Sequence, residues 1–154
     1  MGKRTITKRI GEVLLERAVV DRAQLDEALK RQTTSQKLLG DILVELGYAT
    51  EEAIALALTA QYGFPYLPLD NYEIDHGLTE VVPEQVARRY CLIPIDRIGN
   101  ALTVAMADPT NTQAIEDIEL QTKCMVQTFV STPTDIGKAI NRYYKKTNSN
   151  HGNV

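Results

Sequence analysis

The stretch RIGEVLLERAVVDRAQLDEALKRQ, residues 9–32, is followed after a short spacer by LLGDILVELGYATEEAIALALTAQ, residues 38–61. The two stretches align without a gap, and an internal repeat of this length is typical of a duplicated supersecondary unit. The identical pairs are Gly11/Gly40, Leu14/Leu43, Glu16/Glu45, Ala28/Ala57, Leu29/Leu58 and Gln32/Gln61. This duplication predicts that the first part of the chain is a helical unit with two equivalent halves.

Each copy of the repeat predicts a short helix followed by a longer one. In the first copy Asp21 is the expected N-cap of the longer helix, and Gln24 completes a capping box three residues later. In the second copy Gly47 is the expected C′ residue of the short helix, and Thr50 is the expected N-cap of the long one. A glutamine ends the apolar stripe of each long helix, and a buried or half-buried amide needs a hydrogen-bond partner.

The pattern changes after Tyr62. Residues 92–97 and 101–107 predict two strands joined by a Gly-Asn hairpin turn, residues 112–121 a helix, residues 125–130 a third strand, and Thr132-Pro133 the start of a last helix. The sequence therefore predicts an α+β protein. Its parts are a four-helix tandem-motif unit over 1–62, a small β-β-α-β-α sandwich over 63–146, and a disordered tail over 147–154.

The composition excludes several classes of protein. The sequence has no apolar run near the roughly 20 residues that a membrane helix needs, and no secretion signal at its start. Cys91 and Cys124 fit no zinc spacing and read as reduced core residues, so we expect a cytoplasmic protein without metal or cofactor. The GxxxxGK[ST] signature of P-loop ATPases is absent, which predicts that the chain is not an enzyme.

Charge is unevenly distributed along the chain. The net charge of −3 argues against binding to DNA or RNA. Residues 1–40, however, carry nine lysines and arginines against five acids. This basic first quarter predicts a small anionic ligand or an anionic partner at that end of the chain.

The tandem pattern resembles the Arg-Leu-Gly…Leu…Gly…Leu…Leu…Gln motif, present twice in tandem, of the MshEN domain, the N-terminal module of type II secretion and type IV pilus assembly ATPases. The resemblance covers residues 5 to about 146 and implies binding of cyclic di-GMP, which many members of that family bind. The ligand residues that it implies are Arg9, Ile10, Gly11, Leu14, Leu25, Leu29, Gln32, Leu38, Leu39, Gly40, Leu43, Ile54, Leu58, Gln61 and Asp108.

The chain departs from the family motif at two notable positions. Leu38 occupies the place of the second arginine, and Lys37 beside it is a candidate for the missing charge, although an ammonium does not reproduce a planar guanidinium. Ala18 stands where the motif prefers glycine. Asp108, in an Asp-Pro turn, is open to two interpretations, a turn-forming residue or a contact to guanine.

The motif residues suit cyclic di-GMP chemically. The ligand is a two-fold symmetric dianion with two purines, so a tandem motif can offer each half a similar surface. A glutamine amide both donates and accepts hydrogen bonds at a guanine edge, and arginine pairs with phosphate or with guanine O6 and N7. Backbone amides at the helix starts near Gly11 and Gly40 suit phosphates.

Two functions from different classes follow. The first is a cyclic di-GMP-binding regulatory module of a secretion or pilus ATPase motor, without membrane insertion. The second is a protein-docking module that contacts an inner-membrane platform protein and binds no nucleotide. Leu38 favours the second function, whereas Arg9, the paired glycines, the paired glutamines and Asp108 favour the first.

Overall fold

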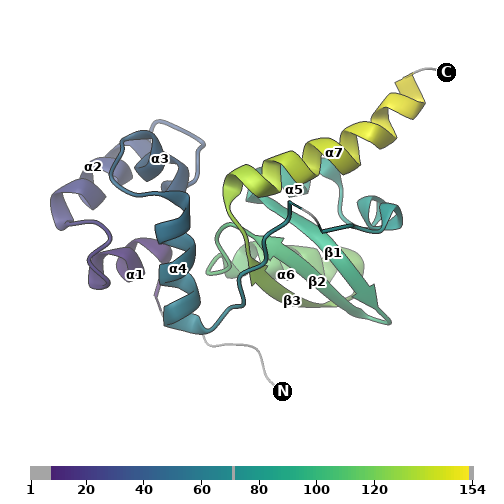
Figure 1. Cartoon of the computed structure of the whole chain (residues 1–154), viewed down its shortest axis with the longest axis horizontal. Helices are drawn as coiled ribbons and strands as arrows, with labels where there is room; N and C mark the ends of the chain where they lie inside the picture. The colour runs from purple at the N-terminus through teal and green to yellow at the C-terminus, as the bar shows by residue number, and fades with distance from the viewer. Residues whose placement is uncertain (1–7, 71, 153–154) are drawn as a thin grey trace. The chain divides into compact units, whose positions relative to one another are not determined.

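A computed structural model describes the backbone of residues 8–70 and 72–152, and the side chains among these up to Tyr144. The chain forms two compact units, Met1–Phe64 and Pro65–Val154 (Figure 1). The sequence prediction puts this boundary two residues earlier, after Tyr62.

The first unit consists of four helices, a short one followed by a longer one in each copy of the repeat (Figure 1). They are α1 (Ile10–Glu16), α2 (Arg22–Gln32), α3 (Leu39–Glu45) and α4 (Glu51–Tyr62). The predicted caps are confirmed: Asp21 Oδ1 accepts the Gln24 N–H at 2.8 Å, and Thr50 Oγ1 accepts the Ala53 N–H at 3.1 Å. The two long helices therefore begin where the sequence predicts, and α3 ends just before Gly47, as expected.

The turn between the two helices of each pair has the same backbone in both copies. Gly47, after α3, has a φ of +78°, and Ala18, its counterpart after α1, has a φ of +60°. The Val19 N–H donates to Leu14 O at 2.9 Å, and the equivalent Tyr48 N–H donates to Leu43 O at 3.0 Å. The glycine of one copy thus shows the conformation that an alanine has to adopt in the other.

The second unit is built on a three-stranded sheet with strand order β1-β2-β3. β1 (Leu92–Ile98) pairs antiparallel with β2 (Ala101–Met106), and β2 pairs parallel with β3 (Met125–Val130). The hairpin between β1 and β2 turns at Gly99, whose φ of +61° favours glycine. The α+β class and the succession of these strands along the chain agree with the sequence prediction.

Four helical segments accompany the sheet: η1 (His76–Glu80), α5 (Glu84–Tyr90), α6 (Thr112–Thr122) and α7 (Pro133–Gly152). α6 connects the two parallel strands, as such a crossover requires. The core of this unit includes Leu102, Val104 and Met106 of β2, all fully buried, together with Ile118 of α6 and Ile136 of α7.

The end of the chain differs from the sequence prediction. α7 continues as a helix to Gly152, whereas a disordered tail is expected from Thr147. Between Lys138 and His151 the sequence has neither proline nor glycine, so nothing in it stops the helix that Pro133 begins. Residues 153 and 154 of the expected tail lie outside the described residues. Among the residues described, no helix is long and apolar enough to span a bilayer.

Candidate functional site

The two motif positions that carry arginine in the family begin equivalent helices. Arg9 is the N-cap of α1 and Leu38 the N-cap of α3, both with extended backbone. Arg9 is exposed, and its N–H donates to Glu12 Oε1 at 3.3 Å. Leu38 is half-buried. The fold therefore places the one arginine and its leucine replacement at matching points of the duplicated unit.

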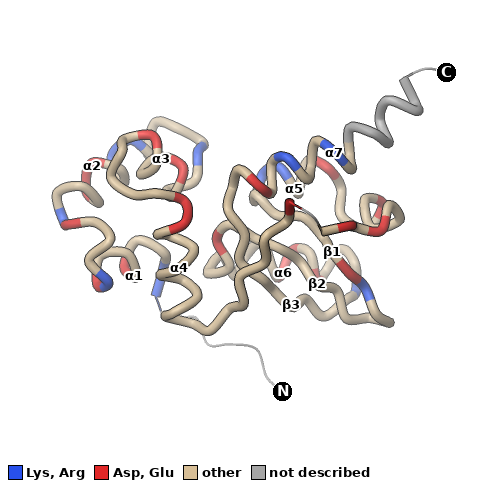
Figure 2. The backbone as a smooth tube through the Cα atoms, viewed as in Figure 1, with Lys and Arg blue, Asp and Glu red and all other residues tan. Residues whose placement is uncertain are grey.

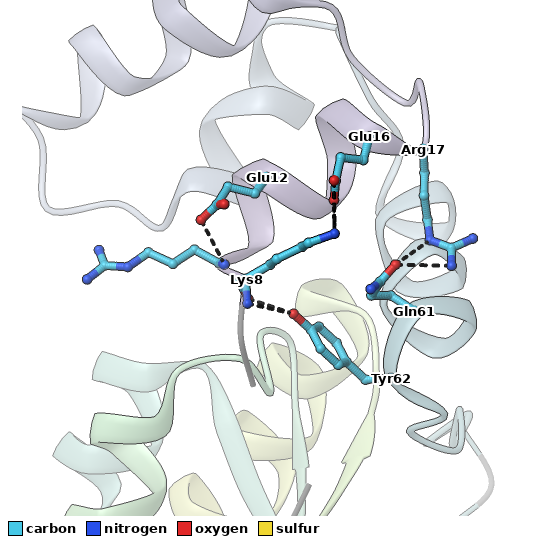
Figure 3. A network of polar contacts seen from close by, with 7 residues as sticks. Lys8, Glu12, Glu16, Arg17, Gln61 and Tyr62 are labelled. Carbon is cyan, nitrogen blue, oxygen red and sulfur yellow. Dashed lines mark hydrogen bonds and ion pairs between the residues drawn. The ribbon is translucent and has the colours of Figure 1, made fainter. Parts of the chain in front are cut away.

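Lysines one residue earlier form a second matched pair. Lys8 Nζ lies 2.5 Å from Glu16 Oε2, and Lys37 Nζ lies 2.5 Å from Glu45 Oε2 (Figure 3 shows the first pair). The hydrogen bond to Glu16 raises the pKa of the Lys8 ammonium. Lys37 is therefore the counterpart of Lys8, and its charge is paired with Glu45.

The two motif glycines have different surroundings. A Cβ added to Gly11 would lie 3.2 Å from both Leu25 Cδ1 and Leu39 Cδ2, which are core side chains. A Cβ added to Gly40 would meet Ile54 Cδ1 at 3.7 Å, an ordinary contact. Packing within the unit therefore explains the glycine of the first copy, whereas the described neighbours of Gly40 leave room for a side chain.

Most of the apolar motif residues form the core of the helical unit. Less than a tenth of each is exposed in the set Ile10, Leu14, Leu25, Leu39, Leu43, Ile54 and Leu58. Leu29 is the exception, with 41% of its surface exposed, although its counterpart Leu58 is fully buried. Leu29 and the half-buried Leu38 are thus the apolar motif side chains that a ligand reaches most easily.

The paired glutamines lie at equivalent positions, but they form hydrogen bonds through opposite ends of the amide group. Gln32 Nε2 donates to the Lys37 carbonyl at 3.3 Å. Gln61 Oε1 accepts from Arg17 Nε at 3.3 Å and from Arg17 Nη2 at 3.2 Å (Figure 3). Both glutamines are half-buried. The first uses its amide nitrogen within the protein, and the second uses its amide oxygen.

Tyr62 connects the end of α4 to the start of α1. Its hydroxyl donates to the Lys8 carbonyl at 2.8 Å and accepts the Lys8 N–H at 3.1 Å (Figure 3). The residue next to Arg9 is thereby fixed on both sides of its backbone. Sequence reasoning missed Tyr62 because its counterpart in the first copy is Thr33, so the repeat gives no signal at this position.

The second copy carries an acidic cluster that the motif comparison also missed. Asp41, in the first turn of α3, is half-buried, and burial, Glu51 and Glu45 raise the pKa of its carboxyl group. Figure 2 shows acidic residues along α3 and at the start of α4. Residues 38–61 contain four acids and neither lysine nor arginine. The second copy is therefore an unfavourable electrostatic environment for a dianion.

Asp108 belongs to the second unit and has the geometry of a turn-forming residue. Its Oδ1 accepts the Thr110 N–H at 3.0 Å and also the Thr110 hydroxyl. Burial raises the pKa of this carboxyl group, and the bonds from Thr110 lower it in part. The first interpretation is thus confirmed, and a contact of Asp108 with a ligand stays a proposal. The described residues contain no group of three or more histidine, cysteine or acidic side chains that could hold a metal ion.

Comparison with known proteins gives matches over most of the chain. The family model of the MshEN domain matches residues 62–150, which are more than half of the chain and leave out the tandem motif of 9–61. The type IV pilus assembly ATPase PilB of Myxococcus xanthus is 32% identical over 136 residues, which are 88% of this chain and 24% of that protein. The chain spans 20–24% of the length of the first curated pilus ATPases it matches.

Solved structures agree with this result. The structure of MshE with cdg, that is, with cyclic di-GMP, is 31% identical, with a TM-score of 0.67 over 89% of this chain and 99% of that one. The N-terminal domain of XpsE has the same fold, with a TM-score of 0.70, 23% identity and coverage of 93% and 99%. The matched range, the helical unit and the three-stranded sheet lead to one conclusion: the chain belongs to the MshEN domain family.

Proposed function

We propose that this chain binds one molecule of cyclic di-GMP along its tandem helical unit. We propose further that it acts in the cytoplasm as the regulatory module of a type IV pilus or type II secretion ATPase. Binding, without a catalytic step, is its role. The similarity to MshE, whose structure holds the dinucleotide, supports this proposal.

The observation that carries the proposal is the room for a side chain at Gly40, where a Cβ would make only an ordinary contact of 3.7 Å with Ile54. Glycine in the first turn of a helix is unfavourable by up to about 1 kcal/mol relative to alanine. At Gly11 the packing of Leu25 and Leu39 leaves no room for a side chain, which explains the glycine despite its cost. The single described neighbour of Gly40 imposes no such requirement. A ligand that contacts the backbone of α3 at this point would require a glycine there, whereas the packing of the protein itself does not require one.

The accessible motif residues supply the chemistry that the ligand needs. The exposed Arg9 guanidinium can pair with a phosphate or with a guanine edge. Leu29 offers an apolar surface to a purine face, and the half-buried carboxamides of Gln32 and Gln61 offer hydrogen bonds to the base. The buried leucines hold these groups in place as core.

A second function is favoured by the second copy. Leu38 removes one arginine, Lys37 is paired with Glu45, and the four acids of residues 38–61 repel phosphate. A module with these features could dock on an inner-membrane platform protein and bind no nucleotide.

Isothermal titration of the chain with cyclic di-GMP decides between these functions. The receptor function predicts saturable binding with one ligand per chain and a melting temperature that rises with ligand concentration. GTP and ATP, titrated under the same conditions, should bind more weakly. Absence of heat and of thermal stabilisation at millimolar cyclic di-GMP would leave the docking function as the better explanation.

A further inference from the structure

The hydrogen bond between Arg17 and Gln61 determines what Gln61 can present to a base. An arginine side chain only donates hydrogen bonds, so the group that faces Arg17 must be the amide oxygen of Gln61. Two donors, Nε at 3.3 Å and Nη2 at 3.2 Å, share this oxygen (Figure 3). The amide NH₂ group is thereby turned away from Arg17.

A glutamine with a fixed orientation reads bases differently from one that rotates freely. A free carboxamide pairs with adenine through N6 and N7, because its oxygen accepts and its nitrogen donates. Guanine presents two acceptors, O6 and N7, on the same edge. A carboxamide whose oxygen is occupied retains only donors and matches guanine better than adenine.

From this geometry we infer that Arg17 is a specificity-determining residue, which holds Gln61 in the orientation that selects guanine over adenine in a cyclic dinucleotide. The inference rests on the proposed function and deepens it. Arg17 acts through Gln61 and is a positioning residue. Only Gln61 of the two glutamines is oriented in this way. The counterpart of Arg17 in the second copy is Leu46, and the amide nitrogen of Gln32 donates to the Lys37 carbonyl.

Because Arg17 is exposed, its substitution tests the orientation of Gln61 without disturbing the core. The side chain lies at the end of α1 on the surface, so its removal creates no cavity in the core. The test variant is Arg17→Leu, which places the residue of the second copy in the first. Arg22→Leu is the matched control, since it removes another exposed arginine of the same unit, whose ion pair with Asp26 is 3.9 Å long.

Titrations with cyclic di-GMP and cyclic di-AMP measure the preference of each variant. Arg17→Leu should reduce the ratio of the two affinities by about tenfold, the effect of one hydrogen bond to a charged group, and should leave the melting temperature of the ligand-free protein unchanged. Arg17→Lys, which retains a cationic donor, should restore most of the preference. Arg22→Leu should keep the wild-type ratio.

A second variant tests the orientation without removing Arg17. Gln61→Glu keeps an acceptor for the guanidinium but replaces the presented NH₂ group by an oxygen. It should weaken cyclic di-GMP binding and bring the affinity for cyclic di-AMP closer to it, with no loss of apo stability.

The outcomes separate this inference from the proposed function. If the wild-type chain binds no cyclic di-GMP, the proposed function is wrong and the inference falls with it. If the wild type prefers cyclic di-GMP and Arg17→Leu keeps that preference, the inference alone is wrong. A variant in which both affinities and the apo melting temperature fall together would show that Arg17 is merely structural, and would also overturn it.

Discussion

The two copies of the helical motif have matching caps and turns but differ in the surfaces they present. Asp21 and Thr50 cap equivalent helices, and Ala18 and Gly47 take the same left-handed turn. The first copy has five basic and five acidic residues over 9–32, whereas the second has four acids and no basic residue over 38–61. The duplication thus preserved what the helices need to fold, and the surface chemistry diverged.

This comparison implies that the two halves of a symmetric ligand would meet unequal surroundings. The exposed Arg9 and Leu29 are both in the first copy, while Leu58 is buried and Leu38 replaces an arginine in the second. A dianion would be attracted mainly by the first copy. Variants made in matched pairs, one in each copy, test this difference.

The largest expected effect comes from the paired leucines. Leu58→Ala removes a fully buried side chain and should lower the free energy of unfolding by about 2–5 kcal/mol. Leu29→Ala removes a side chain that is 41% exposed and should cost roughly 1 kcal/mol or less, but it should weaken cyclic di-GMP binding. Urea denaturation and titration of both variants check this; equal stability losses would mean that the two copies pack alike.

The next effect concerns the unequal N-caps. Arg9→Ala should weaken cyclic di-GMP binding by about 1.5 kcal/mol or more, as expected for a charge-assisted hydrogen bond. Leu38→Arg should strengthen binding or leave it unchanged, because it restores the second arginine beside an acidic cluster. Calorimetric titration measures both. Wild-type affinity in Arg9→Ala would show that the first motif is wrongly assigned.

The glycine pair should give changes of opposite sign. Gly11→Ala places a Cβ 3.2 Å from two buried leucines; the strain of displacing them opposes the gain in helix propensity, and we expect it to prevail and to lower stability by about 1 kcal/mol. Gly40→Ala has room for its Cβ and should raise stability by up to about 1 kcal/mol through helix propensity. Thermal melts with and without ligand are the measurement. If Gly40→Ala bound cyclic di-GMP like the wild type, the main support for the proposed site would be lost.

The smallest effect is expected at the left-handed turns. Ala18 has a φ of +60°, a conformation that costs an L-residue about 1–2 kcal/mol, whereas glycine adopts it freely. Ala18→Gly should therefore stabilise the chain by roughly 0.5–1 kcal/mol after the entropy of the unfolded glycine is subtracted. Gly47→Ala, at φ +78°, should destabilise it by a similar amount. Two changes of the same sign in thermal melts would contradict the equivalence of the two turns.

The helical unit can be predicted from the sequence alone because its signals are local. Side-chain caps at Asp21 and Thr50, a glycine after α3 and apolar residues at helical spacing act within one or two turns, so they can be read from neighbouring residues. The strands of the second unit are equally visible, since Gly99-Asn100 separates two apolar runs. The end of α7 could not be predicted in this way. The polar composition of the last residues suggests disorder, and only the absence of a helix-stopping residue argues for a helix.

The accessibility and orientation of the motif residues depend on how the helices pack together in three dimensions. Leu29 and Leu58 are the same residue type at equivalent positions of the repeat. One is exposed and the other is buried, because burial depends on which helices pack around each of them. The hydrogen bond between Arg17 and Gln61 joins the end of α1 to the end of α4, 44 positions apart in the chain. A repeat shows that two positions are equivalent in the chain; it does not show their partners, because those contacts form only when separate helices come together.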